Sequence, residues 1–262
     1  SLPRRVGLGC MRLSSAVDRD DELSIGVLHA ALDAGVNLLD TAPSYGTGEQ
    51  DQHHNERLVA RALATAPGGA TDVVVATKCG LVREGTAWVP DGRAKSLRAS
   101  CEASLEALGG RPIDLLLLHA PDPRTSIATS ARALASLVDE GLVRAAGLSN
   151  VSLRELEEAS NELDVRALEL AMCPLDEAVY RGGVVARAIA RGIPLLAHSP
   201  IGGPKRKRRL EREPEITAIA RAYATTPATI ALAWLYASSP LVIALPGATR
   251  VETARLAGQA SG

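Results

Sequence analysis

The sequence contains no phenylalanine, and its 262 residues include only four tyrosines and two tryptophans. Alanine, leucine, valine and isoleucine must therefore fill the core, because hydrophobic residues still make up 46% of the chain. A pocket in such a protein has few aromatic rings on which a flat ligand can stack. This scarcity speaks against a flat polyaromatic substrate.

Long apolar runs are also absent: no stretch approaches the roughly 20 apolar residues that a membrane-spanning helix needs. Residues 1–5 lack the apolar core of a secretion signal, so we expect a cytoplasmic protein. The formal net charge of −1 gives no general attraction to nucleic acid or to an acidic membrane surface. We therefore expect neither of them as a partner.

Cysteines are few, and no two of them form a C-x-x-C pair. Metal sites and disulfide frameworks need closer spacings or an oxidising compartment. We expect no metal, and we interpret all four as small buried residues: Cys10, Cys79, Cys101 and Cys173.

What the chain does contain is a regular alternation of short apolar runs with longer amphipathic stretches. This alternation predicts a parallel sheet whose strands are joined by helices. The expected strands are residues 6–9, 37–40, 73–77, 114–119, 145–149, 168–172, 194–199 and 242–245. The expected helices are 22–34, 55–66, 95–108, 127–140, 152–161, 184–191, 215–224 and 227–237.

Eight such units suit a closed barrel, although an open doubly wound sheet has a similar rhythm. The open sheet would carry G-x-G-x-x-G after its first strand, and Gly7 and Gly9 are not followed by that spacing. Polar residues instead end several different strands, which is where barrel enzymes assemble their sites. We predict an α/β fold, a single-domain (β/α)8 TIM barrel over residues 1–262.

Four ionisable residues gather at successive predicted strand ends. Asp40 ends the second strand, Lys78 follows the third and His119 ends the fourth. Tyr45 stands five residues past Asp40. Neighbouring strands of a barrel bring such side chains to one rim, so we predict that the four share a catalytic site.

Their chemistry gives them a joint purpose. A free phenol has a pKa near 10, and a nearby ammonium such as that of Lys78 is expected to lower the value for Tyr45. Asp40 would hold Lys78 charged and oriented, while His119 would hydrogen-bond the oxygen that is protonated. The result is a general acid for a carbonyl oxygen as hydride reaches the carbon. The chain has no hydride donor of its own, so a nicotinamide cofactor is implied.

The order of motifs along nearly the whole chain resembles that of a known family. The segments are residues 33–46 with Asn55 and Glu56, 76–80, 114–119, 147–150, 199–203 and 245–248. Together they resemble the aldo-keto reductase signature. This resemblance implies NADP(H)-linked reduction of a small aldehyde or ketone, or oxidation of the alcohol, with Tyr45 as the general acid and base.

The resemblance also implies a set of cofactor contacts. Ser149 and Asn150 match residues that hydrogen-bond the nicotinamide carboxamide. Ser199, with Gly202 and Gly203, matches a loop that passes over the pyrophosphate. Thr249 and Arg250 stand where the family holds the adenosine 2′-phosphate, which suits a guanidinium; an exposed residue that opens the last helix is the alternative for Arg250.

The sixth strand departs from the family. Glu169 stands in place of a glutamine that contacts the carboxamide, and Met172 in place of a tyrosine that stacks on the nicotinamide. An ionised glutamate cannot donate a hydrogen bond, and methionine offers a softer surface than a ring. The sequence therefore leaves three readings: a working reductase, a non-redox acid/base enzyme (dehydratase, cyclase or epimerase) on the same scaffold, or a protein that only binds.

Three further features remain. Residues 205–209 form a basic run, which we interpret as a solvated loop that helps to hold phosphate rather than as a nucleic-acid site. Trp88 is our candidate for an aromatic wall over the substrate, in a polar loop after the third strand. His54 is a second candidate for substrate contact.

Overall fold

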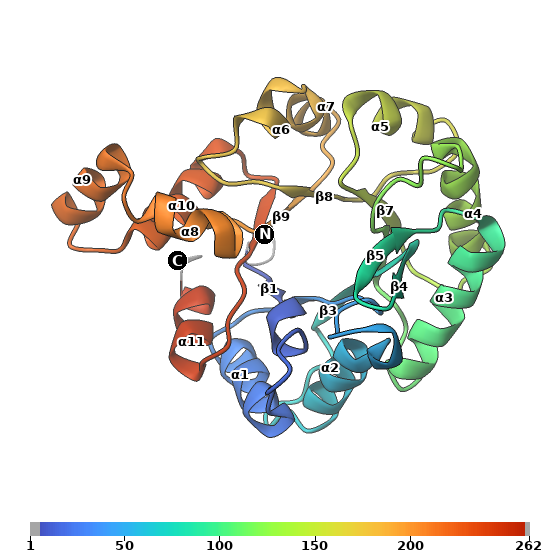
Figure 1. The fold of residues 1–262 in the computed structure, drawn as a ribbon, viewed down its shortest axis with the longest axis horizontal. Helices are drawn as coiled ribbons and strands as arrows, with labels where there is room; N and C mark the ends of the chain where they lie inside the picture. The colour runs from blue at the N-terminus through green and yellow to red at the C-terminus, as the bar shows by residue number, and fades with distance from the viewer. Residues whose placement is uncertain (1–5, 260–262) are drawn as a thin grey trace.

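A computed structural model describes residues 6–259, and for Glu177, Pro204, Lys205, Lys207 and Gln259 it describes the backbone alone. The two ends of the predicted domain, residues 1–5 and 260–262, lie outside the described residues. Eight parallel strands form a ring that is surrounded by helices (Figure 1). The strands, in sheet order, are β1 (Leu8–Gly9), β2 (Leu38–Asp40), β3 (Val74–Cys79), β6 (Leu115–Leu118), β7 (Ala146–Ser149), β8 (Leu168–Ala171), β9 (Leu195–His198) and β10 (Val242–Leu245).

The ring closes between its first and last strands. Parallel bridges join Val6 to Ala244 and Gly9 to Gly247, so β1 meets β10. The predicted (β/α)8 barrel is confirmed. All eight predicted strands occur, and β3 extends two residues further than expected, so Lys78 belongs to the strand itself.

Helices cover the outside of the ring (Figure 1). Their residues are α1 (Asp21–Asp33), α2 (His54–Ala64), α3 (Ala94–Ala107), α4 (Ile127–Asp139), α5 (Leu153–Ala159), α6 (Glu177–Arg181), α7 (Val184–Ala190), α8 (Gly203–Leu210), α9 (Pro214–Ala222), α10 (Pro227–Ser238) and α11 (Val251–Gln259). Short 3-10 turns, η1 (Met11–Leu13) and η2 (Glu49–Asp51), follow β1 and β2. Several helices begin at a residue that can cap them. The side chains of four N-cap residues each accept a hydrogen bond from the backbone N–H three residues later: Asp20, Ser126, Ser152 and Thr226.

The basic run at residues 205–209 corrects one prediction, because it lies in α8 and not in a loop. Lysine and arginine are good helix formers, and proline fits the first turn of a helix, where its missing N–H costs nothing. The Gly203–Pro204 start therefore favours a helix that the charge pattern alone did not indicate.

Two apolar layers follow from the alternation of side chains along each strand. Outward-facing residues pack against the helices, whereas a smaller cluster fills the barrel interior: Leu38, Ala76, Leu115, Leu117, Ala167, Leu196 and Leu245. Gly147 belongs to the same crowded interior, since a Cβ there would lie 2.3 Å from the carbonyl oxygen of Ala167. The next inward position on each strand reaches the carboxyl end of the barrel.

A hairpin interrupts the connection between β3 and α3. Its strands β4 (Leu81–Glu84) and β5 (Ala87–Pro90) pair antiparallel, with Arg83 opposite Trp88. Trp88 therefore lies on a strand and not in the polar loop that we expected, because the Gly85–Thr86 turn folds the segment back on itself, with φ of 58° at Gly85.

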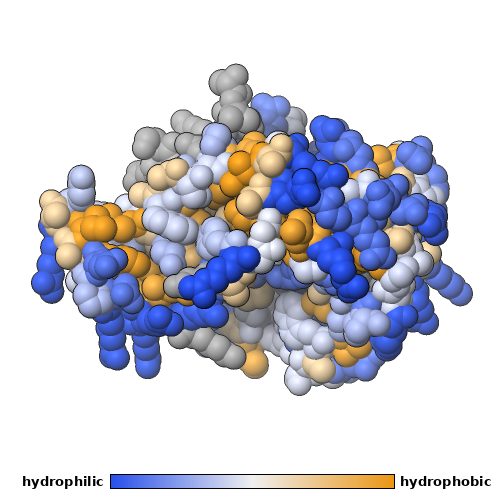
Figure 2. Space-filling view, turned by 90° about the horizontal axis from the view of Figure 1, so that it is seen from above, coloured by the Kyte–Doolittle hydropathy of each residue, from blue (hydrophilic) through white to orange (hydrophobic). Residues whose placement is uncertain are grey.

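The α9 end protrudes from the ring of strands (Figure 1). Figure 2 shows hydrophobic residues on the surface of this protrusion, at the left of the view. On α9 and directly after it, Ile219 and Tyr223 have exposed fractions of 44% and 77%. No helix within residues 6–259 is long and apolar enough to cross a membrane.

Candidate active site

A cavity of about 270 Å³ opens at the carboxyl ends of the strands, where barrel enzymes carry their sites. It is lined by Gly9, Met11, Arg12, Asp40, Tyr45, Trp88, His119, Asn150, Glu169, His198, Ser199, Pro200, Ile201, Gly203, Leu245 and Gly247. A wider, more open hollow of about 860 Å³ lies at the opposite end of the barrel, where residues 160–166 and 191–194 lead into β8 and β9. The smaller cavity is the candidate site, because the ionisable residues of the strand ends face it.

Lys78 lies beneath this cavity and is fully buried. Its ammonium donates to Asp40, donates to the carbonyl of Thr41 at 3.2 Å, and lies 3.2 Å from Oε2 of Glu169. Burial alone lowers the pKa of Lys78, but the two carboxylates outweigh it and raise the pKa well above its ordinary value. The lysine is therefore a fixed positive charge held between two negative ones.

Asp40 shares this lysine with Glu169, and both carboxylates are at least 97% buried, with exposed fractions of 3% and 2%. Burial and the neighbouring charge of Glu169 raise the pKa of Asp40 to about 7, although Lys78 opposes the shift. Oε2 of Glu169 makes no hydrogen bond of good geometry within the described residues. Asp40 therefore changes its protonation near neutral pH, and Oε2 of Glu169 faces the Lys78 ammonium.

Tyr45 is 6% exposed, and its hydroxyl donates to Oδ2 of Asp40 at 3.4 Å. The ammonium of Lys78 lies 4.9 Å from the centre of the Tyr45 ring. Burial and the charge of Asp40 raise the pKa of the phenol well above its ordinary value, and Lys78 reduces this shift only in part. Lys78 thus lowers the phenol pKa as expected, but burial and the charge of Asp40 outweigh it, so the net shift is upward.

His119 completes the group that the sequence predicted, with Nδ1 3.5 Å from the hydroxyl of Ser44. Burial, then the charges of Lys78 and His198, lower its pKa well below the usual value, so the ring is neutral. A neutral imidazole carries one donor and one acceptor nitrogen. The structure brings His119, Asp40, Tyr45 and Lys78 together, although only the first three line the cavity.

Three rings form one wall of the cavity. The centroids of Tyr45 and Trp88 lie 6.2 Å apart, and that of His119 lies 5.7 Å and 5.6 Å from them. His119 meets both rings edge to face, a favourable aromatic arrangement. The predicted role of Trp88 as a wall of the pocket agrees with this position.

Arg83 supports that wall and was missed by sequence reasoning. Its guanidinium donates to the carbonyls of Ser44 at 3.1 Å, Gly46 at 2.8 Å and Thr86 at 2.7 Å. The first two carbonyls flank Tyr45 in the chain. Arg83 thereby ties the hairpin to the loop that carries the phenol.

The residues that we predict to contact the nicotinamide carboxamide lie at different depths below the cavity surface. Asn150 lines the cavity with a positive φ of 59°, and its amide donates to the carbonyl of His119 and to the hydroxyl of Ser149. Ser149 itself is fully buried behind it. Met172 is packed into the hydrophobic core and does not line the cavity, so it offers no stacking surface.

The predicted phosphate contacts lie at two places. Ser199, Gly202 and Gly203 all have positive φ, at 53°, 84° and 62°, and form the turn that leads from β9 into α8. Ser199 and Gly203 line the cavity. Thr249 and Arg250 are exposed at the start of α11 and lie outside the cavity lining.

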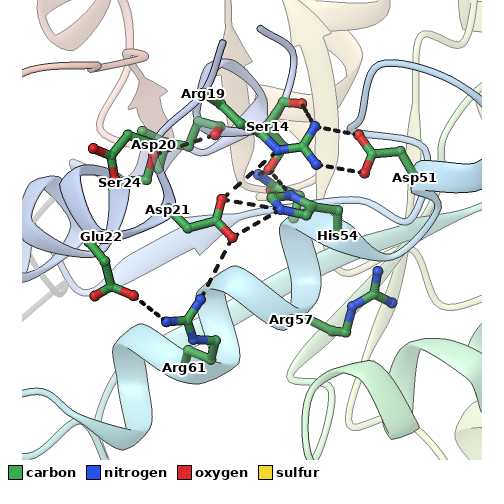
Figure 3. Close-up of polar contacts among 12 residues, drawn as sticks. Ser14, Arg19, Asp20, Asp21, Glu22, Ser24, Asp51, His54, Arg57 and Arg61 are labelled. Atoms are coloured by element: carbon green, nitrogen blue, oxygen red, sulfur yellow. Dashed lines mark hydrogen bonds and ion pairs between the residues drawn. The ribbon is translucent and has the colours of Figure 1, made fainter. Parts of the chain in front are cut away.

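His54 is not brought to the cavity, which corrects its predicted substrate contact. Its Nδ1 lies 2.9 Å from the hydroxyl of Ser14, and its Nε2 lies 3.3 Å from Asp21 (Figure 3). Ser14 is fully buried and also accepts a hydrogen bond from Asn55, so its hydroxyl is closed off from solvent. His54 instead anchors the start of α2 to the start of α1.

The comparisons with known proteins agree with this fold. A sequence model described as the aldo/keto reductase family matches residues 5–260. The chain is 32% identical over 212 residues to aldo-keto reductase str7 of Strobilurus tenacellus. The aligned region covers 77% of this chain and 59% of that protein. It is 31% identical over 209 residues to 6-dehydroglucose reductase of Agrobacterium fabrum. This aligned region covers 76% of this chain and 68% of that protein. The chain therefore spans less than two thirds of the first relative's length.

Solved structures are similar over almost the whole chain. A glycerol dehydrogenase from Gluconobacter oxydans superposes with a TM-score of 0.83 at 28% identity, covering 98% of this chain and 85% of that one. An aldo-keto reductase from Klebsiella pneumoniae, solved with NADPH, has a TM-score of 0.82 at 22% identity, with the same coverage. The second likeness is one of fold alone.

Proposed function

This chain belongs to the aldo/keto reductase family, and on that premise we propose that it is an NADP(H)-dependent oxidoreductase that reduces a small aldehyde or ketone to an alcohol. The observation that carries the proposal is the convergence of Tyr45, His119 and Asp40 on one cavity above the buried ammonium of Lys78. That the reductase forms one domain over residues 1–262, works in the cytoplasm and binds neither nucleic acid nor metal stays a prediction from the sequence.

Tyr45 is the proton donor in this proposal. Its raised pKa keeps the phenol protonated at neutral pH, which is the form that a donor requires. An alkoxide is a stronger base than a phenolate, so the carbonyl oxygen takes the proton once charge develops on it. Lys78, whose ammonium lies 4.9 Å from the centre of the Tyr45 ring, then stabilises the phenolate, and Asp40 in its protonated form supplies the replacement proton.

His119 orients the substrate oxygen. One ring nitrogen lies near Ser44, and the other makes no hydrogen bond within the described residues, so it remains available to the carbonyl oxygen. The neutral ring can donate without adding a positive charge that would compete with Lys78. Trp88 and Tyr45 confine the rest of a small substrate.

The residues along one edge of the cavity fit a nicotinamide dinucleotide. Glu169 lines the cavity, and its Oε2 has an ion pair with Lys78 but no hydrogen bond of good geometry within the described residues, which suits the NH₂ of a carboxamide; Asn150 lies beside it on the cavity wall. The turn of Ser199, Gly202 and Gly203 presents the N-terminus of α8, where unpaired N–H groups attract phosphate. The family uses NADP(H), and Thr249 and Arg250 are our candidates for the 2′-phosphate. When bound, this cofactor would supply the hydride.

The test is a screen of small aldehydes and ketones for NADPH oxidation. Tyr45→Phe removes the donor hydroxyl and should lower turnover by about 10²–10⁴-fold while the protein stays folded. Tyr223→Phe is the matched control, because that tyrosine is exposed and should leave turnover unchanged. Full activity in Tyr45→Phe would contradict the mechanism.

The non-redox acid/base enzyme remains the second candidate, favoured by one observation. Glu169 gives the site a second buried carboxylate next to the lysine, which a hydride transfer does not itself require. A folded protein that binds neither NADPH nor NADH at millimolar concentration would favour that candidate over the reductase.

A further inference from the structure

The floor of the cavity carries more negative than positive charge. Asp40 and Glu169 both pair with Lys78, so the three groups together hold a net charge of −1 when both carboxylates are ionised. All three are nine-tenths or more buried, and buried charges interact more strongly than exposed ones because water screens them less. No second buried cation among the described residues lines the cavity.

The other titratable groups that face the trio do not cancel this charge. Tyr45 beside Asp40 and Cys10 below it are neutral, since burial raises the pKa of both. The two histidines are neutral as well, because burial lowers the pKa of His119 and brings that of His198 on β9 to about 4. Arg12 lines the cavity, but its side chain is exposed to water.

If the proposed function holds, on which this inference rests, the nicotinamide ring lies in this cavity, because hydride must reach the carbon whose oxygen faces Tyr45. The oxidised ring is a cation and the reduced ring is neutral, whereas the phosphates of the two forms are the same. We propose that Glu169 makes the cavity select the oxidised cofactor, NADP⁺, over NADPH. Glu169 is then a residue that determines which cofactor form the site prefers.

A proton accompanies this selection. Asp40 has a pKa of about 7, so near neutral pH the trio is divided between a protonated state with no net charge and an ionised state with a charge of −1. A cationic ring favours the ionised state, so NADP⁺ binding releases a proton. The affinity for NADP⁺ therefore rises with pH through the neutral range, and that for NADPH changes much less.

Glu169 can be substituted without removing the groups that transfer the proton to the substrate. The hydroxyl of Tyr45 contacts Asp40, and the charge of Lys78 is balanced by Asp40 alone when Glu169 is neutral. Glu169→Gln keeps the size of the side chain, retains an acceptor oxygen and removes the surplus charge. Asp122→Asn is the matched control, because Asp122 is also a buried carboxylate but does not line the cavity.

The experiment is calorimetric titration of the full chain with NADP⁺ and NADPH at pH 6 and pH 8, in two buffers of different ionisation enthalpy. We expect about tenfold tighter binding of NADP⁺ than of NADPH at pH 8 and proton release on binding NADP⁺ alone. The ratio of the two constants cancels the titration of the 2′-phosphate, which both forms carry. Glu169→Gln should abolish the preference and the proton release, whereas Asp122→Asn should keep both.

Two results overturn the inference while leaving the reductase proposal intact: equal affinities of the wild-type protein for the two forms at pH 8, or a preference that survives in Glu169→Gln. Binding of neither form counts against the proposed function itself. If Glu169→Gln does not fold in a thermal unfolding check, Asp40→Asn provides the second variant. It also leaves one carboxylate on Lys78, so it should lose the preference, and a preference that it retains overturns the inference.

Discussion

The guanidinium of Arg83 lies 4.2 Å from the centre of the Trp88 ring, with the two residues paired across the β4–β5 hairpin. The same guanidinium bonds the carbonyls on either side of Tyr45. A cation over an aromatic face is attracted to it, and the hydrogen bonds fix the cation in place. The side chain of Arg83 thus holds Trp88 next to the loop that carries the proton donor, Tyr45.

Arg83→Met tests this role. The change leaves three carbonyls without their donor, so we expect a loss of about 2–4 kcal/mol in the free energy of unfolding and a fall in kcat/KM of about tenfold or more. Denaturant unfolding and steady-state kinetics measure the two effects. Arg132→Met is the control, since that exposed arginine pairs with Glu162 at the surface and should leave stability and kcat/KM nearly unchanged. Equal effects of the two changes would contradict the positioning role.

Gly147→Ala probes the crowded barrel interior. The added Cβ would lie 2.3 Å from the Ala167 carbonyl oxygen, so we expect destabilisation of about 3 kcal/mol. Gly26→Ala on α1 is the opposite case, because nothing lies within 4 Å of its Cβ and alanine favours the helix. It should stabilise the protein by about 0.5–1 kcal/mol. Urea unfolding of both variants measures these changes in stability. A Gly147→Ala protein as stable as the wild type would show that the barrel interior rearranges to accept the added methyl group.

Substitutions of His54 and Trp88 should have different effects, the first on stability and the second on KM. His54→Ala removes contacts with Ser14 and Asp21 and should lower stability by about 1–2 kcal/mol while KM for a carbonyl substrate stays the same. Trp88→Ala removes part of the cavity wall and should raise KM about tenfold. Kinetics of both variants under conditions where both are folded make the comparison. A raised KM in His54→Ala would return that residue to the substrate site.

The pH dependence of stability follows from Asp40. Its pKa is about 7 in the folded protein and about 3.9 when unfolded, so the folded state holds the proton more tightly. This contribution to stability is present in full below the unfolded value and is lost as pH rises through about 7. Between pH 4.5 and 8 the wild-type protein should lose more stability than Glu169→Gln, by about 1–2 kcal/mol, because the substitution removes the repulsion and leaves the larger effect of burial in place. Unfolding curves that change in parallel would show that Glu169 does not raise the pKa of Asp40.

The sequence predicted the barrel and the grouping of its ionisable residues because both depend on simple periods. Side chains alternate along a strand, so Asp40, Lys78 and His119 each follow an inward apolar residue by two positions. Glu169 and His198 obey the same register after Ala167 and Leu196. That register is a usable signal for placing Glu169 near Lys78, although the resemblance to the family marks this position only as a departure.

Other features depend on contacts between distant parts of the chain and had no local signal. The bonds of Arg83 reach carbonyls 37 and 39 residues earlier, and a sequence does not reveal which carbonyls will lack partners. The raised pKa of Tyr45 depends on burial and on the sharing of one lysine by two carboxylates. The position of His54 likewise follows from the packing of α2 against α1, and not from its distance to Tyr45 in the sequence.

The β4–β5 hairpin separates proton transfer from the shaping of the cavity wall. Asp40, Lys78 and His119 stand on or directly after barrel strands, whose register fixes them, whereas Trp88 stands on a hairpin of ten residues, Leu81 to Pro90, that contributes nothing to the ring. New side chains in the hairpin can therefore reshape what the cavity admits without disturbing the strand register. Arg83 limits this freedom, because it bonds the carbonyls on either side of Tyr45 and so links a change in the hairpin to the proton donor.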